Sequence, residues 1–338
     1  MLKKIQQHLK KNLLLYVSIA MVAGLLLGHP NAAWTKAHNV SVKDLTTIIV
    51  FFIIYPMMVN LKLESLAKAG RNWKGLALAL AYNFLWAPIF GYLLAKGFLS
   101  DPLLALGFLM VMVVPCSSMS IGYTGLAEGN VELATVTVAL SFLVAIGAVP
   151  LWMSVFAGQY DVAVPIGDML MSILEVLIAP MVLGYLTRIF LVRSYGEKKY
   201  REWQPFFPSL SLLAMFAIVF VIFFAKATII VDKWQMILLL LVPEALFFLV
   251  TLTVITLLNR WMKIPYEEHM ALVFASAGKN NGTAIAIAAT AFSPLVAVPA
   301  AVMPVFQIFF LVMYLKLADR LRTYFDAGKK NTLLEERS

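Results

Sequence analysis

The chain has 338 residues, of which 62% are hydrophobic and only 13% are charged, and its formal net charge is +9. A soluble domain needs far more charge to cover its surface, so the composition excludes an ordinary soluble fold. The positive charge does not indicate a nucleic-acid partner, because the Lys and Arg residues lie in connections between apolar blocks.

The apolar blocks are long enough to cross the hydrocarbon layer of a bilayer, which takes about 20 helical residues each. Backbone polar groups in lipid must be satisfied within their own segment, and the alternating pattern of a membrane β-barrel is absent, so we expect an all-α polytopic membrane protein. The start of the chain resembles a signal peptide, but nine further apolar segments follow, so we interpret it as an uncleaved first helix. In chain order, the ten predicted spans are 13–28, 44–61, 75–97, 103–127, 131–157, 166–190, 206–226, 234–258, 267–292 and 295–318.

The Lys and Arg residues predict an orientation for these spans. With ten spans and a cytoplasmic N-terminus, 21 of the 27 Lys and Arg residues fall on the cytoplasmic side, five on the outer side, and Lys279 within a span. This bias is the positive-inside signal. We therefore expect a multi-pass protein of the cell (inner) membrane with both termini cytoplasmic, a soluble loop at 193–206 and a frayed polar tail after Arg322.

Ten spans divide into two predicted repeats of five, at 1–162 and 163–322, followed by a cytoplasmic tail at 323–338. Because five is an odd number, the second repeat is inverted in the membrane. The long fourth and ninth spans occupy equivalent positions in the two halves, and each is interrupted by polar residues. Interrupted helices in matching positions of two halves indicate a transport site near the membrane midplane.

The interruption in the fourth span begins at Pro115, which lacks an N–H group and breaks the helical hydrogen-bond ladder. Freed carbonyls and hydroxyls there can bind a small cation or a polar solute, although a proline kink patched by serine back-bonding accounts for the same residues. The sulfur of Cys116 is a candidate ligand for a soft metalloid, although a lone membrane cysteine is more often a small core residue. The candidate binding residues here are Pro115, Cys116, Ser117, Ser118 and Ser120.

The interruption in the ninth span places Lys279 with about half a span of apolar residues on each side. Intramembrane charges mark functional sites, so we interpret Lys279 as a substrate or coupling residue that faces a cavity. A short re-entrant loop that reaches water, or a structural ion pair, is the alternative. The candidate binding residues here are Ser276, Lys279, Asn280, Asn281 and Thr283.

Two carboxylates in other spans are candidate partners of Lys279 or cavity-lining groups. Glu244 follows Pro243 in the eighth span and is the better candidate, because Glu175 can simply face the outer end of the sixth span. Asn60 and Asn83 are single polar residues in apolar helices, and we interpret them as interhelical hydrogen-bonding residues.

The fourth span carries the spaced pattern P-x4-S-x5-L-A-x-G-N, formed by Pro115, Ser120, Leu126, Ala127, Gly129 and Asn130. With this pattern it resembles the Pro-containing helix of the bile acid:sodium symporter superfamily. The ninth span, SAGKNNGTAIAIA, is similar to that superfamily's second broken helix. The Pro115–Cys116 pair resembles the arsenite efflux branch, which carries a functionally important cysteine at this place.

The resemblance implies a core domain and a panel domain, with the two broken helices crossing in the core, and transport by alternating access. Sodium-coupled members have Glu and Gln where this chain has Ser276 and Asn280, so the resemblance implies that the sodium site is incomplete. A fixed ammonium group of Lys279 can occupy the space of a sodium ion, or exchange a proton in each cycle.

Together, residues and resemblance predict a secondary transporter for proton-linked efflux of arsenite- or antimonite-type metalloid oxyanions. Cys116 and the hydroxyls would contact this substrate. The alternative is a sodium- or proton-coupled transporter of organic anions, such as bile-acid-like or keto-acid carboxylates, with Lys279 as their partner. The expected partners are thus a small anionic or metalloid solute, protons or sodium, and the lipid bilayer, but not nucleic acid.

We expect neither an enzyme nor a cofactor or metal centre. The sequence contains no nucleotide-binding motif of a primary pump and no H-E-x-x-H motif. A hydrolase that uses Ser117 or Ser118 with Lys279 is the enzymatic alternative, and it would act in detergent without any gradient.

Overall fold

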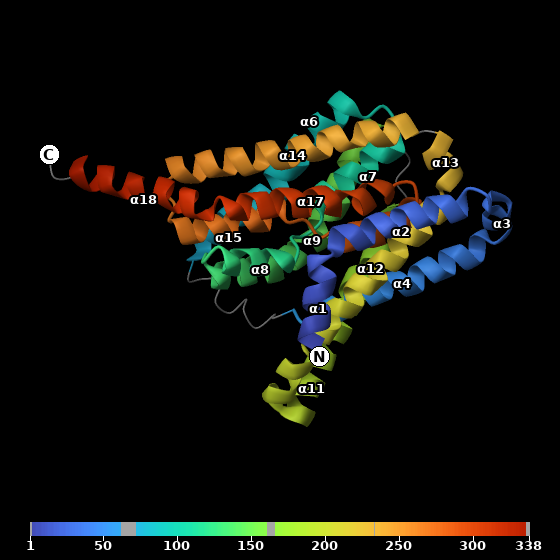
Figure 1. Ribbon diagram of the computed structural model, residues 1–338, viewed down its shortest axis with the longest axis horizontal. Helices are drawn as coiled ribbons and strands as arrows, with labels where there is room; N and C mark the ends of the chain where they lie inside the picture. The colour runs from blue at the N-terminus through green and yellow to red at the C-terminus, as the bar shows by residue number, and fades with distance from the viewer. Residues whose placement is uncertain (1, 62–71, 161–165, 233, 336–338) are drawn as a thin grey trace.

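The computed structural model describes residues 2–61, 72–160, 166–232 and 234–335, and these ranges contain helices but no strands (Figure 1). Three short π-helical turns are labelled η. The elements are α1 (Leu2–Lys11), α2 (Leu13–Gly28), α3 (Ala32–Ala37), α4 (Asn39–Val59), α5 (Trp73–Ala81), η2 (Tyr82–Trp86), α6 (Ala87–Phe98), α7 (Pro102–Val113), α8 (Met119–Leu126), α9 (Val131–Gln159), α10 (Ile166–Ile173), η3 (Leu174–Ile178), α11 (Ala179–Trp203), α12 (Phe206–Ala225), α13 (Ala227–Asp232), α14 (Trp234–Trp261), α15 (Tyr266–Ala277), α16 (Asn281–Ile287), η4 (Ala288–Phe292), α17 (Val298–Lys316) and α18 (Ala318–Glu335).

Five helical segments in the described ranges are long and apolar enough to cross a membrane. They are Trp73–Phe98, Val131–Gln159, Phe206–Ala225, Leu238–Trp261 and Val298–Lys316. Four shorter apolar helices accompany them, at Leu15–Gly28, Ile48–Val59, Pro102–Val113 and Asn281–Phe292. The chain is therefore an all-helical, multi-pass membrane protein. The count of ten spans, the inverted repeat with its boundaries at 162 and 322, and the cytoplasmic termini stay predictions.

Helices occupy all ten predicted spans, and both predicted interruptions are present. The helical path stops between α7 and α8 and again between α15 and α16. Two expectations about the connections were wrong. The predicted loop at 193–206 is helical up to Trp203, because α11 continues through a kink at Gly196 (φ 80°), a backbone angle that glycine adopts without strain.

The predicted frayed tail is also helical, since α18 continues from Ala318 to Glu335. The start of α18 is held against the rest of the protein by specific contacts. Arg322 donates a hydrogen bond to Glu128 at 2.7 Å, and the ring of Phe325 stacks on His269 at 4.3 Å between centroids. These contacts explain why a polar segment is ordered there.

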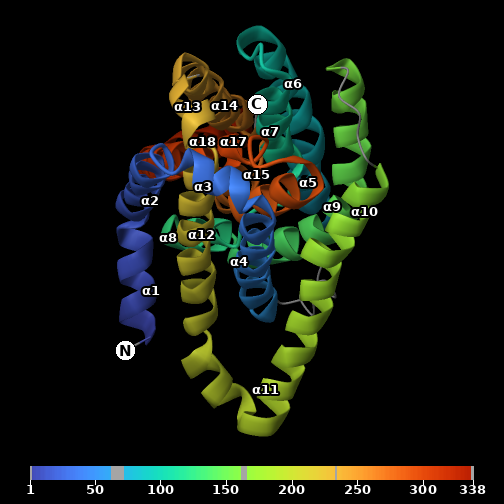
Figure 2. The same ribbon diagram turned by 90° about the vertical axis from the view of Figure 1, so that its right-hand side faces the viewer.

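The helices form two groups, which we call the layer and the bundle (Figure 2). In the layer, α12 packs along both α2 and α4, and α4 also packs along α11. In the bundle, α7 packs against α6, α9 and α17, while α15 packs against α5, α8, α9 and α14. The two groups meet where α16 crosses α4 and where α17 touches α2.

Close packing within the layer depends on Gly28, which faces the backbone of α12. A Cβ atom at Gly28 would lie 2.2 Å from the carbonyl oxygen of Phe224, whereas a Cβ at Gly147 on α9 would meet nothing within 4 Å. We expect Gly28→Ala to destabilise the protein by about 1–3 kcal/mol through overpacking. Gly147→Ala should be neutral or slightly stabilising, because Ala is the better helix former. Thermal unfolding of both variants in detergent tests this, and equal melting temperatures would contradict it.

Candidate functional site

The two interrupted helices contact each other at their breaks. The backbone N–H of Ser117 donates to the carbonyl of Gly278 at 2.7 Å, and the N–H of Asn280 donates to the carbonyl of Pro115 at 3.0 Å. Cys116 and Lys279 are thereby paired as in one rung of an antiparallel sheet. The backbone groups that Pro115 and the breaks release are therefore satisfied by the opposite break, as a dry setting requires.

Two helices end at this crossing and two begin there. α7 ends at Val113 and α15 at Ala277, while α8 begins after Ser118 and α16 begins after Asn280. The side chain of Asn280 caps α16 by accepting from the N–H of Thr283 at 3.1 Å. The crossing thus combines two partly positive helix N-termini with two partly negative C-termini.

The ammonium group of Lys279 lies on the side of the C-termini and is completely buried. It donates to the carbonyl of Met112, near the end of α7, at 2.9 Å. It also donates to the backbone carbonyl of Asn83 at 3.0 Å and to the side-chain oxygen of the same residue. Its three N–H donors therefore meet three oxygen acceptors. These acceptors belong to Asn83 and Met112, and none of them is a carboxylate oxygen.

A cavity of about 400 Å³, which we call the inner cavity, opens beside the crossing between the bundle and the layer. Its bundle wall carries polar groups around the two helix breaks among apolar side chains, and its layer wall is mostly apolar. The polar residues of the bundle wall are Ser117, Ser118, Thr135, Asn280, Asn281 and Gln307. Lys279 also lines it and is the one residue with a charged side chain among the described residues that do so. The apolar lining includes Ile53, Met57, Met58, Phe142 and Met215.

Several predicted site residues lie behind this wall rather than on it. Cys116 is completely buried, does not line the cavity, and has its sulfur 3.2 Å from the hydroxyl of Ser141. Ser120 donates to the carbonyl of Phe274 at 2.8 Å, and Ser276 donates to that of Leu272 at 2.6 Å. Thr283 is also fully buried. These residues pack the crossing, and their contact with a substrate stays a prediction.

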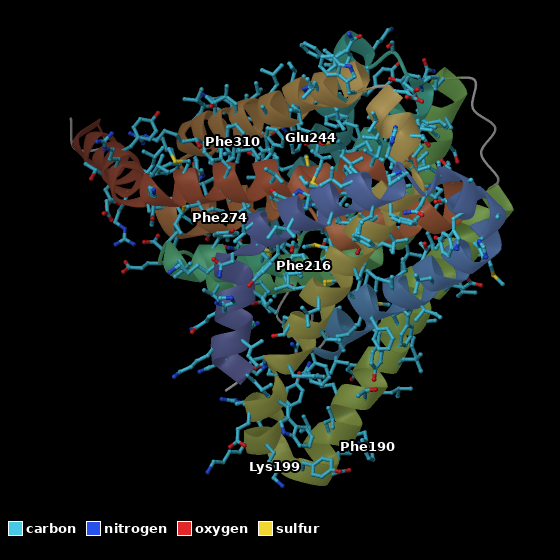
Figure 3. The ribbon with its side chains drawn as sticks, turned by 45° about the vertical axis from the view of Figure 1, so that its right-hand side comes forward. Phe190, Lys199, Phe216, Glu244, Phe274 and Phe310 are labelled. Atoms are coloured by element: carbon cyan, nitrogen blue, oxygen red, sulfur yellow. The ribbon has the colours of Figure 1, made fainter. Side chains whose placement is uncertain are left out.

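Glu244 lies on α14 (Figure 3) and is not among the described residues that line the cavity. Its helix α14 pairs with the α5–α6 segment through Thr251, which accepts a hydrogen bond from Trp86 at 3.1 Å. Glu244 precedes Thr251 by seven residues, which corresponds to about 10 Å along a helix. This direction along α14 leads away from Asn83, the partner of Lys279. Both of its carboxylate oxygens are buried without a partner in the described part of the chain, so the uncharged acid is the form that fits there. Glu175 is exposed, whereas Lys279 is buried.

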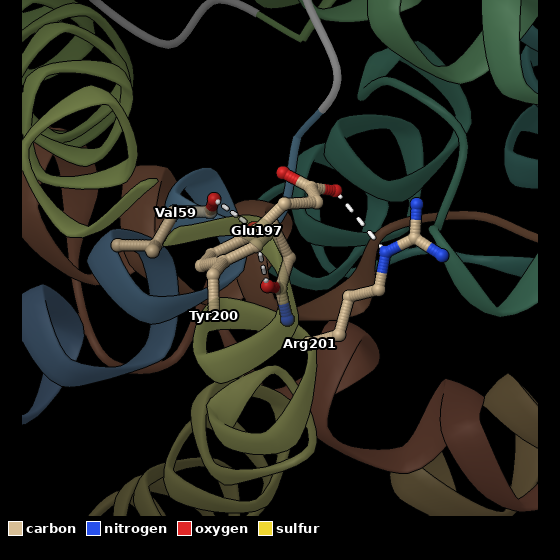
Figure 4. Close-up of polar contacts among 5 residues, drawn as sticks. Val59, Glu197, Tyr200 and Arg201 are labelled. Atoms are coloured by element: carbon tan, nitrogen blue, oxygen red, sulfur yellow. Dashed lines mark hydrogen bonds and ion pairs between the residues drawn. The ribbon is translucent and has the colours of Figure 1, made fainter. Parts of the chain in front are cut away.

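Residues at the junction of α4 with α11 and α12, among them Asn60 and Gln204, also line the inner cavity. Figure 4 shows the polar contacts at this junction. The hydroxyl of Tyr200 donates to the carbonyl of Val59 at 3.0 Å and contacts the side-chain oxygen of Asn60 at 3.1 Å. Asn60 donates in turn to the carbonyl of Gln204 at 2.9 Å. These bonds fix the end of α4 beside the predicted cytoplasmic connections.

A second cavity of about 770 Å³, the outer cavity, lies on the other side of the crossing. It is lined from the opposite ends of the same layer helices and from η4, and its polar lining includes Thr46, Lys226, Asp232 and Thr290. Along α4, Thr46 lines the outer cavity, whereas Ile53, Met57 and Met58 line the inner cavity. A membrane protein with cavities on both sides of two broken, crossing helices has the architecture of a secondary transporter.

Residues 47–233 match the Sodium Bile acid symporter family, so the chain belongs to that family. Three relatives agree with this. The arsenical-resistance protein Acr3 of Alkaliphilus metalliredigens is 24% identical over 306 residues, covering 84% of each chain. The uncharacterized sodium-dependent transporter YocS of Bacillus subtilis is 23% identical, covering 77% of this chain and 78% of its own. The probable chloroplastic sodium/metabolite cotransporter BASS1 of Oryza sativa is 31% identical, covering 46% of this chain and 38% of its own.

Proposed function

We propose that this chain carries a small organic anion across the membrane by alternating access, and that it does so without sodium. The observation that carries the proposal is the inner cavity. Its polar groups are concentrated at the two helix breaks on the bundle side, and apolar side chains make up most of the remaining lining, which is the form that suits a charged head group attached to an apolar body.

The charge of the solute follows from the electrostatics of the bundle wall. The first turns of α8 and α16 contribute Ser118, Met119, Asn281 and Gly282 to the lining, so both helix N-termini lie at the cavity. No described lining residue is acidic, and the lining residue Lys279 adds a positive charge through its buried ammonium group. Anions are stabilised by helix N-termini and by nearby cations.

The independence from sodium follows from the contacts of Lys279. Unwound backbone carbonyls near broken helices are the groups that coordinate sodium in secondary transporters. Here the carbonyls of Asn83 and Met112 and the amide oxygen of Asn83 already hold an ammonium group that is part of the protein. The ammonium form of Lys279 thus supplies the positive charge that a coupling ion would bring, and a proton is the remaining candidate for the coupling ion.

Uptake into everted membrane vesicles tests the proposal. Radiolabelled carboxylates of four to eight carbons and radiolabelled arsenite would each be offered with a pH gradient or a sodium gradient. We expect saturable carboxylate uptake that is unchanged when choline replaces sodium. Carboxylate uptake that depends on a sodium gradient would refute sodium independence, and absence of carboxylate uptake would refute the substrate class.

A metalloid hydroxide is the second candidate substrate, because of the likeness to an arsenical-resistance protein and the position of Cys116 at the crossing. The thiol is within 3.2 Å of Ser141 and off the cavity, so it would have to turn toward the cavity to bind arsenite. The size and apolar walls of the cavity favour the organic anion.

The variant Cys116→Ser separates the two candidates. Its side chain is similar in size and can keep the contact with Ser141, so we expect organic-anion uptake within about twofold of the unmodified protein, as for a modest polar change in a packed site. If arsenite were the substrate, loss of the soft sulfur ligand would abolish transport. Parallel uptake of arsenite and a carboxylate by both proteins decides between them.

A further inference from the structure

Ser211 on α12 lies on the layer wall of the inner cavity, opposite the polar bundle wall. Its hydroxyl oxygen is buried and has no hydrogen-bond partner among the described residues. A buried hydroxyl without a partner costs free energy, which a suitable ligand group recovers when it binds. Leu212 and Met215 flank Ser211 on the same wall, so Ser211 is a polar residue within an apolar stretch of the α12 lining.

The neighbouring Ser209 shows what a serine on this helix ordinarily does. Its hydroxyl donates to the carbonyl of Pro205, four residues earlier, at 2.8 Å. A serine within a helix usually satisfies its hydroxyl group by such a hydrogen bond to the backbone carbonyl four residues earlier. Ser211 does not make the equivalent bond to Phe207, although the same backbone geometry offers it. The hydroxyl of Ser211 is therefore not held by its own helix, and a change of side-chain rotamer would turn it toward the cavity that Ser211 lines.

We propose that Ser211 binds a second polar group of the transported anion, so that the substrates are short carboxylates with a hydroxyl or carbonyl group remote from the carboxylate. This inference rests on the proposed function. The carboxylate lies against the bundle wall, at the helix N-termini and near Lys279, while the remote group bonds to Ser211 across the apolar middle of the cavity.

A solute held in this way touches both helix groups at once. Because bundle and layer must move relative to each other for alternating access, a ligand that bonds to both favours the closed, loaded state over the closed, empty one. A solute that lacks the second polar group makes only the bundle contacts and lacks this bias. Ser211 thereby selects among anions and also links solute binding to closure.

The test compares Ser211→Ala with Ser209→Ala, the matched control on the same helix. Everted vesicles would take up pairs of carboxylates of equal length, four to eight carbons, with and without a terminal hydroxyl. We expect Ser211→Ala to lower kcat/KM for the preferred hydroxylated acid about five- to tenfold, the effect of losing one hydrogen bond, and to leave its unsubstituted partner unchanged. Ser209→Ala should change kcat/KM equally for both acids. Ser211→Thr, which keeps a hydroxyl group, should retain the preference for the hydroxylated acid.

Equal effects of Ser211→Ala on both members of each pair, or no effect on either, would overturn the assignment of Ser211 while leaving organic-anion transport intact. Absence of uptake of every carboxylate by the unmodified protein would instead overturn the proposed function, and the role of Ser211 with it. The two failures are thus distinguishable in one data set.

Discussion

Replacement of Lys279 by Ala should reduce transport at least about 100-fold, because each hydrogen bond to a charged group contributes about 1.5–3 kcal/mol and each 1.4 kcal/mol is a factor of ten. The variant leaves the carbonyls of Asn83 and Met112 and the amide oxygen of Asn83 without their donor in a buried position. It also removes the positive charge behind the bundle wall, where the anion binds.

The space that the variant vacates has a definite chemistry, so the loss should be reversible. Lys279→Ala removes three methylene groups and the ammonium, which together correspond to propylammonium. We expect added propylammonium, and to a smaller extent sodium, to restore part of the uptake of Lys279→Ala, with no effect on the unmodified protein. The exposed Lys96 supplies the control, since Lys96→Ala should transport normally. Undiminished sodium-free transport by Lys279→Ala would show that the ammonium group is not required.

A disulfide between positions 53 and 282 should stop transport completely. A Cβ atom at Gly282 would lie 2.7 Å from the Cγ2 atom of Ile53, so the two Cβ atoms would be at most roughly 4.2 Å apart, given a C–C bond of about 1.5 Å. Disulfides span Cβ–Cβ distances of about 3.5–4.5 Å. Gly282 belongs to the bundle and Ile53 to the layer, and both line the inner cavity.

The pair Ile53→Cys and Gly282→Cys would be introduced into the Cys116→Ser background, in which no other cysteine exists. Oxidation should abolish uptake and reduction should restore it, because the cross-link holds the bundle against the layer with the inner cavity accessible. Each single cysteine variant should be insensitive to oxidant. A fully cross-linked protein that transports at its reduced rate would mean that these helix groups do not separate during the cycle.

The sequence predicted the helices well because a run of apolar residues, which indicates a membrane helix, can be recognised within one segment of the chain. The apolar block at 13–28 coincides with α2, and the breaks at Pro115 and around Lys279 are visible as polar residues within apolar segments. The connection at 193–206 and the tail were misjudged, because their order comes from contacts of Tyr200 with α4 and of Phe325 with His269. Such contacts involve residues far apart in the chain.

The candidate site was predicted only in part, for the same reason. The crossing residues were found from their pattern, but the side of the crossing on which each side chain lies was not. The sequence indicated that Asn83 forms a hydrogen bond between helices. The structure shows that its partner is Lys279, which the sequence did not identify. Gln307 and Ser211 line the cavity without any local sequence signal beyond a polar residue in an apolar helix. Glu244 stood out in the sequence yet lies away from the cavity.

The most direct measurement of the central claim is counterflow in proteoliposomes that contain the purified protein and no sodium. Vesicles loaded with an unlabelled hydroxylated carboxylate would be diluted into a trace of the same labelled compound. We expect transient accumulation of label above equilibrium, at the same rate when sodium is added. Accumulation only in the presence of sodium, or none for any carboxylate while arsenite is accumulated, would contradict it.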